Sequence, residues 1–301
     1  MTSTNAGRVA LTGADNLVGG QVARALCEEG IGVRALVPPE APRWHLSDLA
    51  IDWRTLRNDE GEAGWSEALH GAGALIVADT QRWSGQTGQA AEARQRSVAR
   101  LRRVLDAAQR AHIPRVVVVS GEQTLADGSA EGAARLPEDF GSPQTQGLLA
   151  VESELYRYVA QGMNVCLVVA GLPLGPGDVR GDQLGLFAPD MPMHEGVLHP
   201  CDARDLAQAI VAAARKGRAG RRYPVLGKPV PLEKLTELLD AHGGCARPAA
   251  SKRHWPPDWA LRALPLLSDQ AAGELGVRSR PLALTIRDTA RWYRQAGMLR
   301  Y

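Results

Sequence analysis

Residues 8–37, RVALTGADNLVGGQVARALCEEGIGVRALV, form the stretch that decides the fold of this chain. A short apolar run leads into a turn that begins at Gly13, and apolar residues then recur with helical period until Gly30. A second apolar run closes the unit, so the pattern predicts strand, glycine turn, helix and strand. Units of this kind bind dinucleotides, because their glycines admit a pyrophosphate and the helix N-terminus offers free N–H groups.

The turn departs from the usual three-glycine pattern at its middle position. Gly13 and Gly19 occupy the outer positions, and Asn16 replaces the glycine between them. An asparagine can adopt the left-handed backbone that glycine favours, but its side chain can fill the space of a phosphate. We select Gly13, Asn16, Gly19 and Leu17 as candidate cofactor-binding residues. Asp79, which follows a later apolar run, is a fifth candidate.

Strands and helices are expected to alternate through the first half of the chain. Short apolar runs at residues 74–78, 115–120 and 164–169 predict buried strands. Segments at about 90–112 and 144–161 have the apolar period of helices. This alternation predicts the α/β class, with a Rossmann-type doubly wound parallel sheet.

The composition changes after Gly171. Residues 171–200 are rich in glycine, proline, methionine and histidine and show little periodicity, and an amphipathic helix is expected at residues 205–216. We assign residues 1–170 to a nucleotide-binding domain. Residues 171–301 are assigned to a smaller α/β lobe that binds substrate and is interleaved with the first domain.

Composition and charge favour a soluble, globular, cytoplasmic protein. The chain has 301 residues, is 45% hydrophobic and 23% charged, and has a formal net charge of +2. The basic residues are scattered, which argues against nucleic-acid or membrane partners. The four cysteines are far apart, so we expect neither a zinc site nor a disulfide framework. No signal pattern is present at the N-terminus, and the expected partner is a small-molecule substrate.

Five segments resemble, in the same order, motifs of the extended short-chain dehydrogenase/reductase family, especially its sugar-epimerase and dihydroflavonol-reductase-like branches. They are LTGADNLVGGQVARAL, HIPRVVVVSG, GLPLGPGD, PCDARDLAQAI and RDTARWYRQAGML. The resemblance covers nearly the whole chain. It implies a Rossmann fold with a nicotinamide cofactor at the glycine turn.

The resemblance also implies a Tyr-x-x-x-Lys pair, in which the tyrosine passes a proton and the lysine holds the nicotinamide ribose. Counted back from Glu152, the tyrosine position falls at Gln144 and the lysine position at Leu148. Neither residue can replace its family counterpart, since glutamine has no titratable proton and leucine has no charge. The family's serine or threonine corresponds to Thr124 or, alternatively, to Ser120.

The residues that usually contact the adenosine ribose are missing from their places. Relatives carry an acidic or basic residue at the end of the second strand, where this chain has Pro38. Glu40, Arg43 and Arg54 are substitutes at other offsets. The sequence therefore leaves open whether NAD(P) binds here or no cofactor binds.

Replacement chemistry is expected around the same cleft. Glu122, His194 and Asp202, together with Thr124, are the candidate catalytic residues, because carboxylates and imidazoles exchange protons near neutral pH. In the alternative, Glu122 and His194 are solvated loop residues and Asp202 caps a helix. The candidate substrate-binding residues are Trp83, Gln144, Leu148, Met191 and Met193. No metal site is expected.

Three hypotheses about function follow. The first is an atypical enzyme that acts on a small, fairly apolar metabolite by non-redox chemistry, such as cyclisation, isomerisation or dehydration. The second is an NAD(P)-dependent reductase or epimerase with a substituted proton donor, and the third is a non-catalytic nucleotide or metabolite sensor. By analogy with relatives, a homodimer would pair the long helices at about 90–112 and 144–161.

Overall fold

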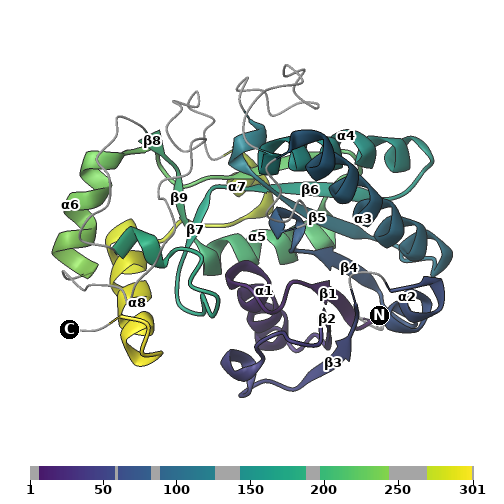
Figure 1. Cartoon of the computed structure of the whole chain (residues 1–301), viewed down its shortest axis with the longest axis horizontal. Helices are drawn as coiled ribbons and strands as arrows, with labels where there is room; N and C mark the ends of the chain where they lie inside the picture. Colours follow the sequence, from purple (N-terminus) through teal and green to yellow (C-terminus); the bar gives the residue numbers. More distant parts are fainter. Residues whose placement is uncertain are drawn as a thin grey trace.

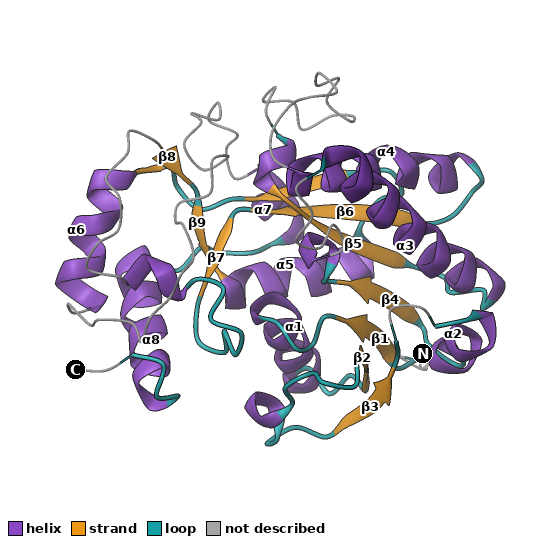
Figure 2. Ribbon diagram, viewed as in Figure 1, coloured by secondary structure: helices purple, strands orange, loops and turns teal. Residues whose placement is uncertain are grey.

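A single parallel sheet organises the molecule (Figures 1 and 2). The computed structural model describes residues 7–57, 60–82, 89–125, 143–187, 197–243 and 270–299. Seven strands lie in the order β10-β6-β5-β4-β1-β2-β3, and every neighbouring pair is parallel. They are β1 (Val9–Thr12), β2 (Val33–Val37), β3 (Ile51–Thr55), β4 (Ala74–Val77), β5 (Val116–Gly121), β6 (Val165–Ala170) and β10 (Arg222–Val225). The predicted α/β class and Rossmann-type sheet are confirmed.

Helices cover both faces of this sheet, because its strands are apolar on both sides. On one face, α1 (Leu17–Glu28) packs against α5 (Ala203–Lys216), and α7 (Gln270–Leu275) packs beside α5. The other face is covered by α2 (Glu62–Leu69), α3 (Ala90–Arg110) and α4 (Pro143–Ala160). The sheet therefore separates two apolar cores.

The remaining elements form a smaller lobe at one end of the molecule, away from α2 (Figure 1). In it, β7 (Leu172–Leu174) pairs with β9 (Pro200–Asp202), and β8 (Val197–Leu198) pairs with β11 (Val230–Pro231). The helices are α6 (Leu232–Gly243) and α8 (Leu282–Gln295). Leu174, Leu235, Ile286 and Tyr293 belong to its separate core.

Local sequence patterns predicted several helices correctly but missed some of the strands. The helices predicted at about 90–112, 144–161 and 205–216 are confirmed as α3, α4 and α5. The sequence did not predict β3, whose residues IDWRT are only partly buried because the strand lies at the sheet edge. The short strands of the lobe were also missed. Among the described residues, no helix is both long and apolar enough to cross a membrane.

Candidate functional site

A cleft of about 740 Å³ opens where β1, β4, β5 and β6 end. Its lining includes the start of α1, the residues that follow β4, and the segment from Ala170 to Pro173 that leads into the lobe. The carboxyl ends of parallel strands are where ligands bind in doubly wound folds. The cleft is therefore the candidate functional site.

Glycine is required at two points of the turn that begins the cleft. Gly13 has a φ of +76°, a left-handed conformation that residues with a side chain rarely adopt. A Cβ atom at Gly19 would lie 2.1 Å from the carbonyl oxygen of Gly13, so α1 packs directly against the turn. These two glycines shape the site as the sequence pattern predicted.

Asn16 caps α1, and its backbone is not left-handed. Its φ and ψ are −124° and 171°, so the left-handed conformation considered for it is wrong. The side-chain oxygen accepts a hydrogen bond from the N–H of Gly19 (2.9 Å), and the side-chain nitrogen donates to the carbonyl of Ala78 (2.9 Å). Both polar ends of Asn16 thus bond to backbone, and the side chain secures the turn to the end of β4.

The first N–H groups of α1 remain available to a ligand. Leu17 and Val18 line the cleft, and their N–H groups have no intrahelical acceptor because they open the helix. Such a helix end favours an anion. The structure therefore retains the elements of a phosphate site, despite the loss of the middle glycine.

Two arginines reach the same turn from different parts of the chain. Arg82, in a short turn after β4, contacts the carboxylate of Asp15 at 3.1 Å. Arg180, which follows β7, pairs with the same carboxylate and donates from Nε to the Asp15 carbonyl at 3.0 Å. Burial alone would raise the pKa of Asp15, but the bond from Arg180 and the charge of Arg82 lower it. Asp15 is therefore charged at neutral pH and holds both guanidinium groups at the edge of the cleft.

The residues considered as contacts for an adenosine ribose follow β2 or lie on β3. Pro42 lines the cleft, and the neighbouring Arg43 lies over the Trp53 ring at 5.3 Å and donates to Thr55. Arg54 pairs with Asp52 on the edge strand β3. Of the three substitutes considered, Arg43 lies next to a residue of the cleft wall.

Three glutamine amides lie close together in the cleft, and one of them, Gln144, is at the position to which the resemblance assigns the proton-donating tyrosine. Gln81, Gln123 and Gln144 all line the cleft, and Gln144 donates to the backbone carbonyl of Gln81 at 3.0 Å. Leu148, one turn further along α4, is 2% exposed and does not line the cleft. Gln144 is thus in contact with the site, whereas Leu148 is a core residue. A substrate contact of Leu148 stays a prediction, which its burial does not favour.

Thr124 is engaged in a buried hydrogen-bond network. Its hydroxyl lies 2.6 Å from the Glu152 carboxylate, which also accepts from Ser120 at 2.5 Å. Arg222 on β10 completes the network with a 3.1 Å contact to Glu152. Ser120, Thr124, Glu152 and Arg222 are almost inaccessible to solvent, and burial raises the pKa of Glu152 against the opposing charge of Arg222. This network ties the end of β5 to α4 and β10.

Glu122 contacts His199, which was not among the candidate catalytic residues selected from the sequence. Its carboxylate lies 2.9 Å from Nδ1 of His199, and both side chains are 2% exposed. The alternative in which Glu122 is a solvated loop carboxylate is therefore wrong. Burial raises the pKa of Glu122, and the neighbouring imidazole opposes that rise.

Asp202 caps a helix, the structural role that was the alternative to a catalytic one. It accepts from the N–H of Arg204 at 2.8 Å and so caps α5, and Thr285 of α8 donates to it at 2.8 Å. Burial would raise the pKa of Asp202, but the bonds from Arg204 and Thr285 lower it. Its cap and lobe contacts are confirmed, and a catalytic role stays a prediction.

The other selected residues divide into one at the cleft and four outside the described residues. Asp79 lines the cleft and accepts from the Thr12 hydroxyl at 2.5 Å. The residues outside the described ranges are Trp83, Met191, Met193 and His194.

The sequence missed the partners that connect distant segments. Arg82, Arg180, His199 and Arg222 come from four different segments, and no local spacing connects them to Asp15, Glu122 or Glu152. His199 lies between the candidates His194 and Asp202 in the sequence, which was the one available signal.

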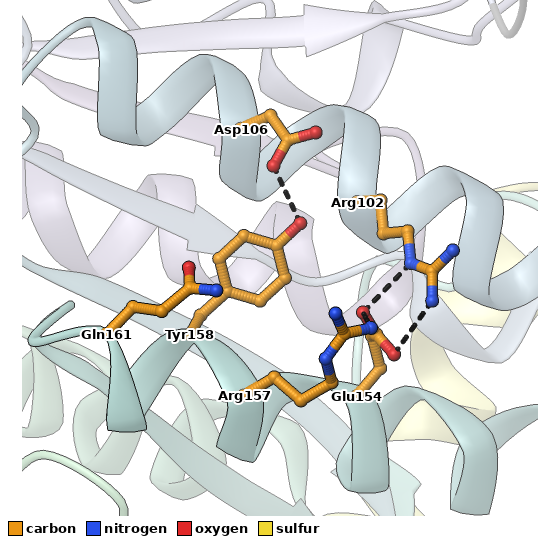
Figure 3. Close-up of a pocket in the computed structure, with 6 residues that line it drawn as sticks. All are labelled: Arg102, Asp106, Glu154, Arg157, Tyr158 and Gln161. Carbon is orange, nitrogen blue, oxygen red and sulfur yellow. Dashed lines mark hydrogen bonds and ion pairs between the residues drawn. The ribbon is translucent and has the colours of Figure 1, made fainter.

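A second hollow, of about 350 Å³, lies between α3 and α4 (Figure 3). Arg102 of α3 makes paired contacts with Glu154 of α4 at 2.8 and 3.1 Å, and Tyr158 donates to Asp106 at 2.7 Å. Burial and the Asp106 carboxylate raise the pKa of Tyr158. This tyrosine therefore faces the outer hollow and not the cleft.

Comparison with known proteins gives relatives at low sequence identity. No family model matches the chain. A protein of Synechocystis sp. that is provisionally named a dihydroflavonol 4-reductase is 27% identical over 267 residues, which cover 82% of this chain and 76% of that protein. Sterol demethylase protein B of Methylococcus capsulatus is 23% identical, over 96% of this chain and 99% of that protein.

Solved structures share the fold over almost the whole chain. A nucleoside-diphosphate-sugar epimerase of Pseudomonas aeruginosa has a TM-score of 0.79 at 20% identity, covering 97% of this chain and 99% of that chain. A dTDP-glucose 4,6-dehydratase of Streptomyces venezuelae, solved with NAD, has a TM-score of 0.73 at 19% identity, covering 96% and 97%. Alfalfa vestitone reductase has a TM-score of 0.72 at 16% identity, covering 97% and 100%. The neighbours are epimerase/dehydratase and reductase proteins, which confirms the resemblance predicted from the motifs.

Proposed function

We propose that this chain is an enzyme of the extended short-chain dehydrogenase/reductase family that acts on a small, fairly apolar metabolite by non-redox chemistry. Cyclisation, isomerisation and dehydration are the reaction types that fit. The proposal rests on the shared fold and on the cleft at the carboxyl edge of the sheet. It is an enzyme proposal because the named neighbours are epimerases, dehydratases and reductases.

One observation carries the choice of non-redox chemistry. Gln144 stands in the cleft at the position to which the resemblance assigns the proton-donating tyrosine, and its amide donates to Gln81. An amide cannot deliver a proton at neutral pH. Leu148 lies in the core, where it offers no charge to a nicotinamide ribose. The family's usual hydride chemistry depends on both functions, so its absence from these two positions favours another reaction.

The polarity of the cleft supports a small, fairly apolar substrate. Val119, Leu172, Pro173 and Val179 contribute apolar surface, and Gln81, Gln123 and Gln144 contribute uncharged amides. Apolar walls with a few placed hydrogen-bonding groups are typical of small-molecule sites. Arg82 and Arg180 add charge to the lining beside the glycine turn.

This charge favours a second candidate, an NAD(P)-dependent reductase or epimerase with a substituted proton donor. Leu17 and Val18 present backbone N–H groups, and Arg82 and Arg180 add positive charge beside them. These groups fit the pyrophosphate of a dinucleotide, and NAD(P) bound there would supply hydride transfer. Asp15 partly neutralises the arginines, which weakens the attraction for an anion.

One experiment separates the two candidates. Purified protein is incubated with a panel of small hydrophobic ketones, alcohols and olefins, with and without each of NAD, NADH, NADP and NADPH. Products are identified by mass spectrometry. We expect products of unchanged mass, or products that have lost water, in the absence of any nicotinamide. Conversion that requires an added nicotinamide would establish the second candidate, with a gain of two hydrogens for a reductase and an unchanged mass for an epimerase.

Calorimetric titration with the same four nucleotides completes the test. Binding tighter than about 10 µM, or about 7 kcal/mol, would show that the phosphate end is functional and would contradict a cofactor-free enzyme. Absence of binding at millimolar concentration would exclude the NAD(P)-dependent reductase as a candidate function. If no panel compound is converted under any condition, a non-catalytic sensor becomes the better explanation.

A further inference from the structure

Asp79 places a carboxylate at the point where the strand order of the sheet reverses. From β1 the sheet continues to β2 and β3 on one side, whereas β4, β5 and β6 follow on the other side (Figure 1). Thr12 is the last residue of β1, and Asp79 lies two residues after Val77, the last residue of β4. In doubly wound folds the crevice at such a reversal is where ligands bind. Asp79, which lines the cleft, therefore stands where a bound molecule is expected.

The Asp79 side chain is oriented through one oxygen and accessible through the other. Oδ1 accepts a hydrogen bond from the Thr12 hydroxyl at 2.5 Å, and Asp79 has no second side-chain partner among the described residues. Asp79 is only partly buried, and the described residues do not enclose Oδ2. The backbone is held as well, because the N–H of Arg82 donates to the Asp79 carbonyl at 3.0 Å. The geometry thus fixes the carboxylate and leaves Oδ2 to a molecule in the cleft.

Two other carboxylates near the cleft are already engaged. Asp15 pairs with Arg82 and Arg180, and its side chain is 1% exposed and does not line the cleft. Asp182 lines the cleft but has a partner of its own. Asp79 forms no ion pair within the described part of the chain. Asp79 is therefore the lining carboxylate that no other side chain neutralises directly.

A positive charge on α3 balances Asp79 without contacting it. Burial lowers the pKa of Arg100, and the charge of Asp79 opposes that shift. The two groups interact through space, and the structure shows no ion pair between them. The Asp79 carboxylate is thus supported electrostatically while its open oxygen keeps its hydrogen-bonding capacity.

We infer that Asp79 is the catalytic residue that carries the proton in the proposed reaction, and that Thr12 orients it. This inference rests on the proposed function and names the group that performs its proton transfers. A general base has to come within hydrogen-bond reach of its substrate, and Asp79 meets this condition because it lines the cleft. Thr12 is 1% exposed and does not line the cleft, so it is a positioning residue that acts through Asp79.

The proton balance closes on one carboxylate. In the isomerisation of a β,γ-unsaturated ketone, Asp79 takes a proton from the carbon between the carbonyl and the double bond. The electrons of that C–H bond form a dienolate, and Asp79 returns the proton to the far alkene carbon, which leaves a conjugated ketone. In a dehydration, Asp79 takes the proton from carbon and gives it to the departing hydroxyl, which leaves as water. Either way Asp79 ends as the carboxylate, and no oxidant or reductant is consumed.

The test follows the isomerisation of cyclohex-3-en-1-one, a small apolar ketone, to its conjugated isomer by ultraviolet absorbance. We expect the wild-type protein to accelerate this reaction. Asp79→Asn keeps the size of the side chain and an acceptor for Thr12, and it should reduce the acceleration by about 100-fold or more, the scale of general acid–base catalysis. The matched control is Asp240→Asn, at an exposed position of α6, which should keep full activity.

A pair of substitutions at Thr12 tests its positioning role. Thr12→Val removes the hydroxyl with little change of shape, and kcat for the same ketone should fall about tenfold, the ratio that corresponds to one ordinary hydrogen bond. KM should change little, because Thr12 does not reach the cleft. Thr12→Ser keeps the hydroxyl and should restore kcat. If Thr12→Ser is as slow as Thr12→Val, the hydroxyl does not orient Asp79.

A second readout does not depend on turnover. In protein labelled with [γ-¹³C]aspartate, the signal of Asp79 is identified by its absence from Asp79→Asn. Addition of cyclohex-3-en-1-one should shift this signal and leave that of Asp240 in place. If the wild type isomerises the ketone and Asp79→Asn does so equally fast, the inference is overturned while the proposed function stands. If the wild type gives no acceleration, or the Asp79 signal does not move, the inference is also overturned, and the product panel tests the proposed function independently.

Discussion

Two buried glutamates, Glu122 and Glu152, differ in how the surrounding side chains compensate their charge. Glu152 on α4 is held by Arg222, Ser120 and Thr124, so that its charge is compensated from three directions. Glu122 is equally buried, and among the described residues its one ion-pair contact is His199, while neither of its oxygens accepts a hydrogen bond; in Glu152 this holds for Oε2 only. A carboxylate that serves only the fold is normally paired on all sides. The comparison therefore separates a carboxylate that arginine and two hydroxyls compensate from one that has a histidine alone as its contact among the described residues.

The largest expected effect comes from removing the charge that compensates Glu152. Arg222→Met leaves that carboxylate buried with only hydroxyl partners, and breaking such a pair costs about 3–5 kcal/mol of unfolding free energy. Chemical denaturation of the wild-type protein and of Arg222→Met measures this loss. The double variant Arg222→Met/Glu152→Leu removes both charges and should recover most of the stability. If it is as unstable as Arg222→Met, charge compensation is not what Arg222 provides.

A smaller effect is expected from one hydrogen bond of the same network. Ser120→Ala removes the 2.5 Å bond to the Glu152 carboxylate and should cost about 1.5–3 kcal/mol, the range for bonds to charged groups. Ser97→Ala is the matched control, because the Ser97 hydroxyl is equally buried and has no hydrogen-bond partner among the described residues. Equal losses of denaturation free energy in both variants would show that the Ser120 bond contributes nothing specific.

The fold could be predicted from the sequence because the patterns that indicate it are local. The contacts of Glu122 and Glu152 could not be predicted, because their partners lie far away in the sequence. Residues 8–37 contain strand, turn, helix and strand in one continuous segment, and α3 to α5 follow from apolar period alone. His199 meets Glu122 through a separation of 77 positions, and Arg222 meets Glu152 through 70, so no spacing rule connects them.

Asn16 shows how a local signal can also mislead. As a replacement for glycine it raised two expectations: that asparagine can adopt a left-handed backbone here, and that its side chain can fill the space of a phosphate. In the structure it is an ordinary helix cap, because asparagine is among the best N-cap residues and Gly19 supplies the N–H that it accepts. The substitution is compatible with α1 and leaves the first N–H groups of the helix available.

Glu122→Gln is expected to raise the unfolding free energy, whereas Arg222→Met and Ser120→Ala are expected to lower it. Replacing a buried, poorly compensated carboxylate by a neutral amide of the same shape should raise the unfolding free energy by about 1–2 kcal/mol near neutral pH. Denaturation curves of wild type and variant measure the change. A loss of stability would place Glu122 with Glu152 as a structural residue.

The smallest effect lies in the pH dependence of that gain, and its sign follows from the raised pKa of Glu122. Below the ordinary glutamate value of about 4.5, both folded and unfolded chains hold the proton, so wild type and Glu122→Gln should differ little. As pH rises from there towards the folded-state pKa, the unfolded chain loses its proton first, and the wild-type protein is progressively destabilised. The burial that raises the pKa of Glu152 produces the same trend, but it is present in both proteins and cancels in their difference. The stability advantage of Glu122→Gln should therefore grow with pH and then level off. An advantage that shrank over this range would mean that the Glu122–His199 contact stabilises the charged carboxylate, as Arg222 does for Glu152.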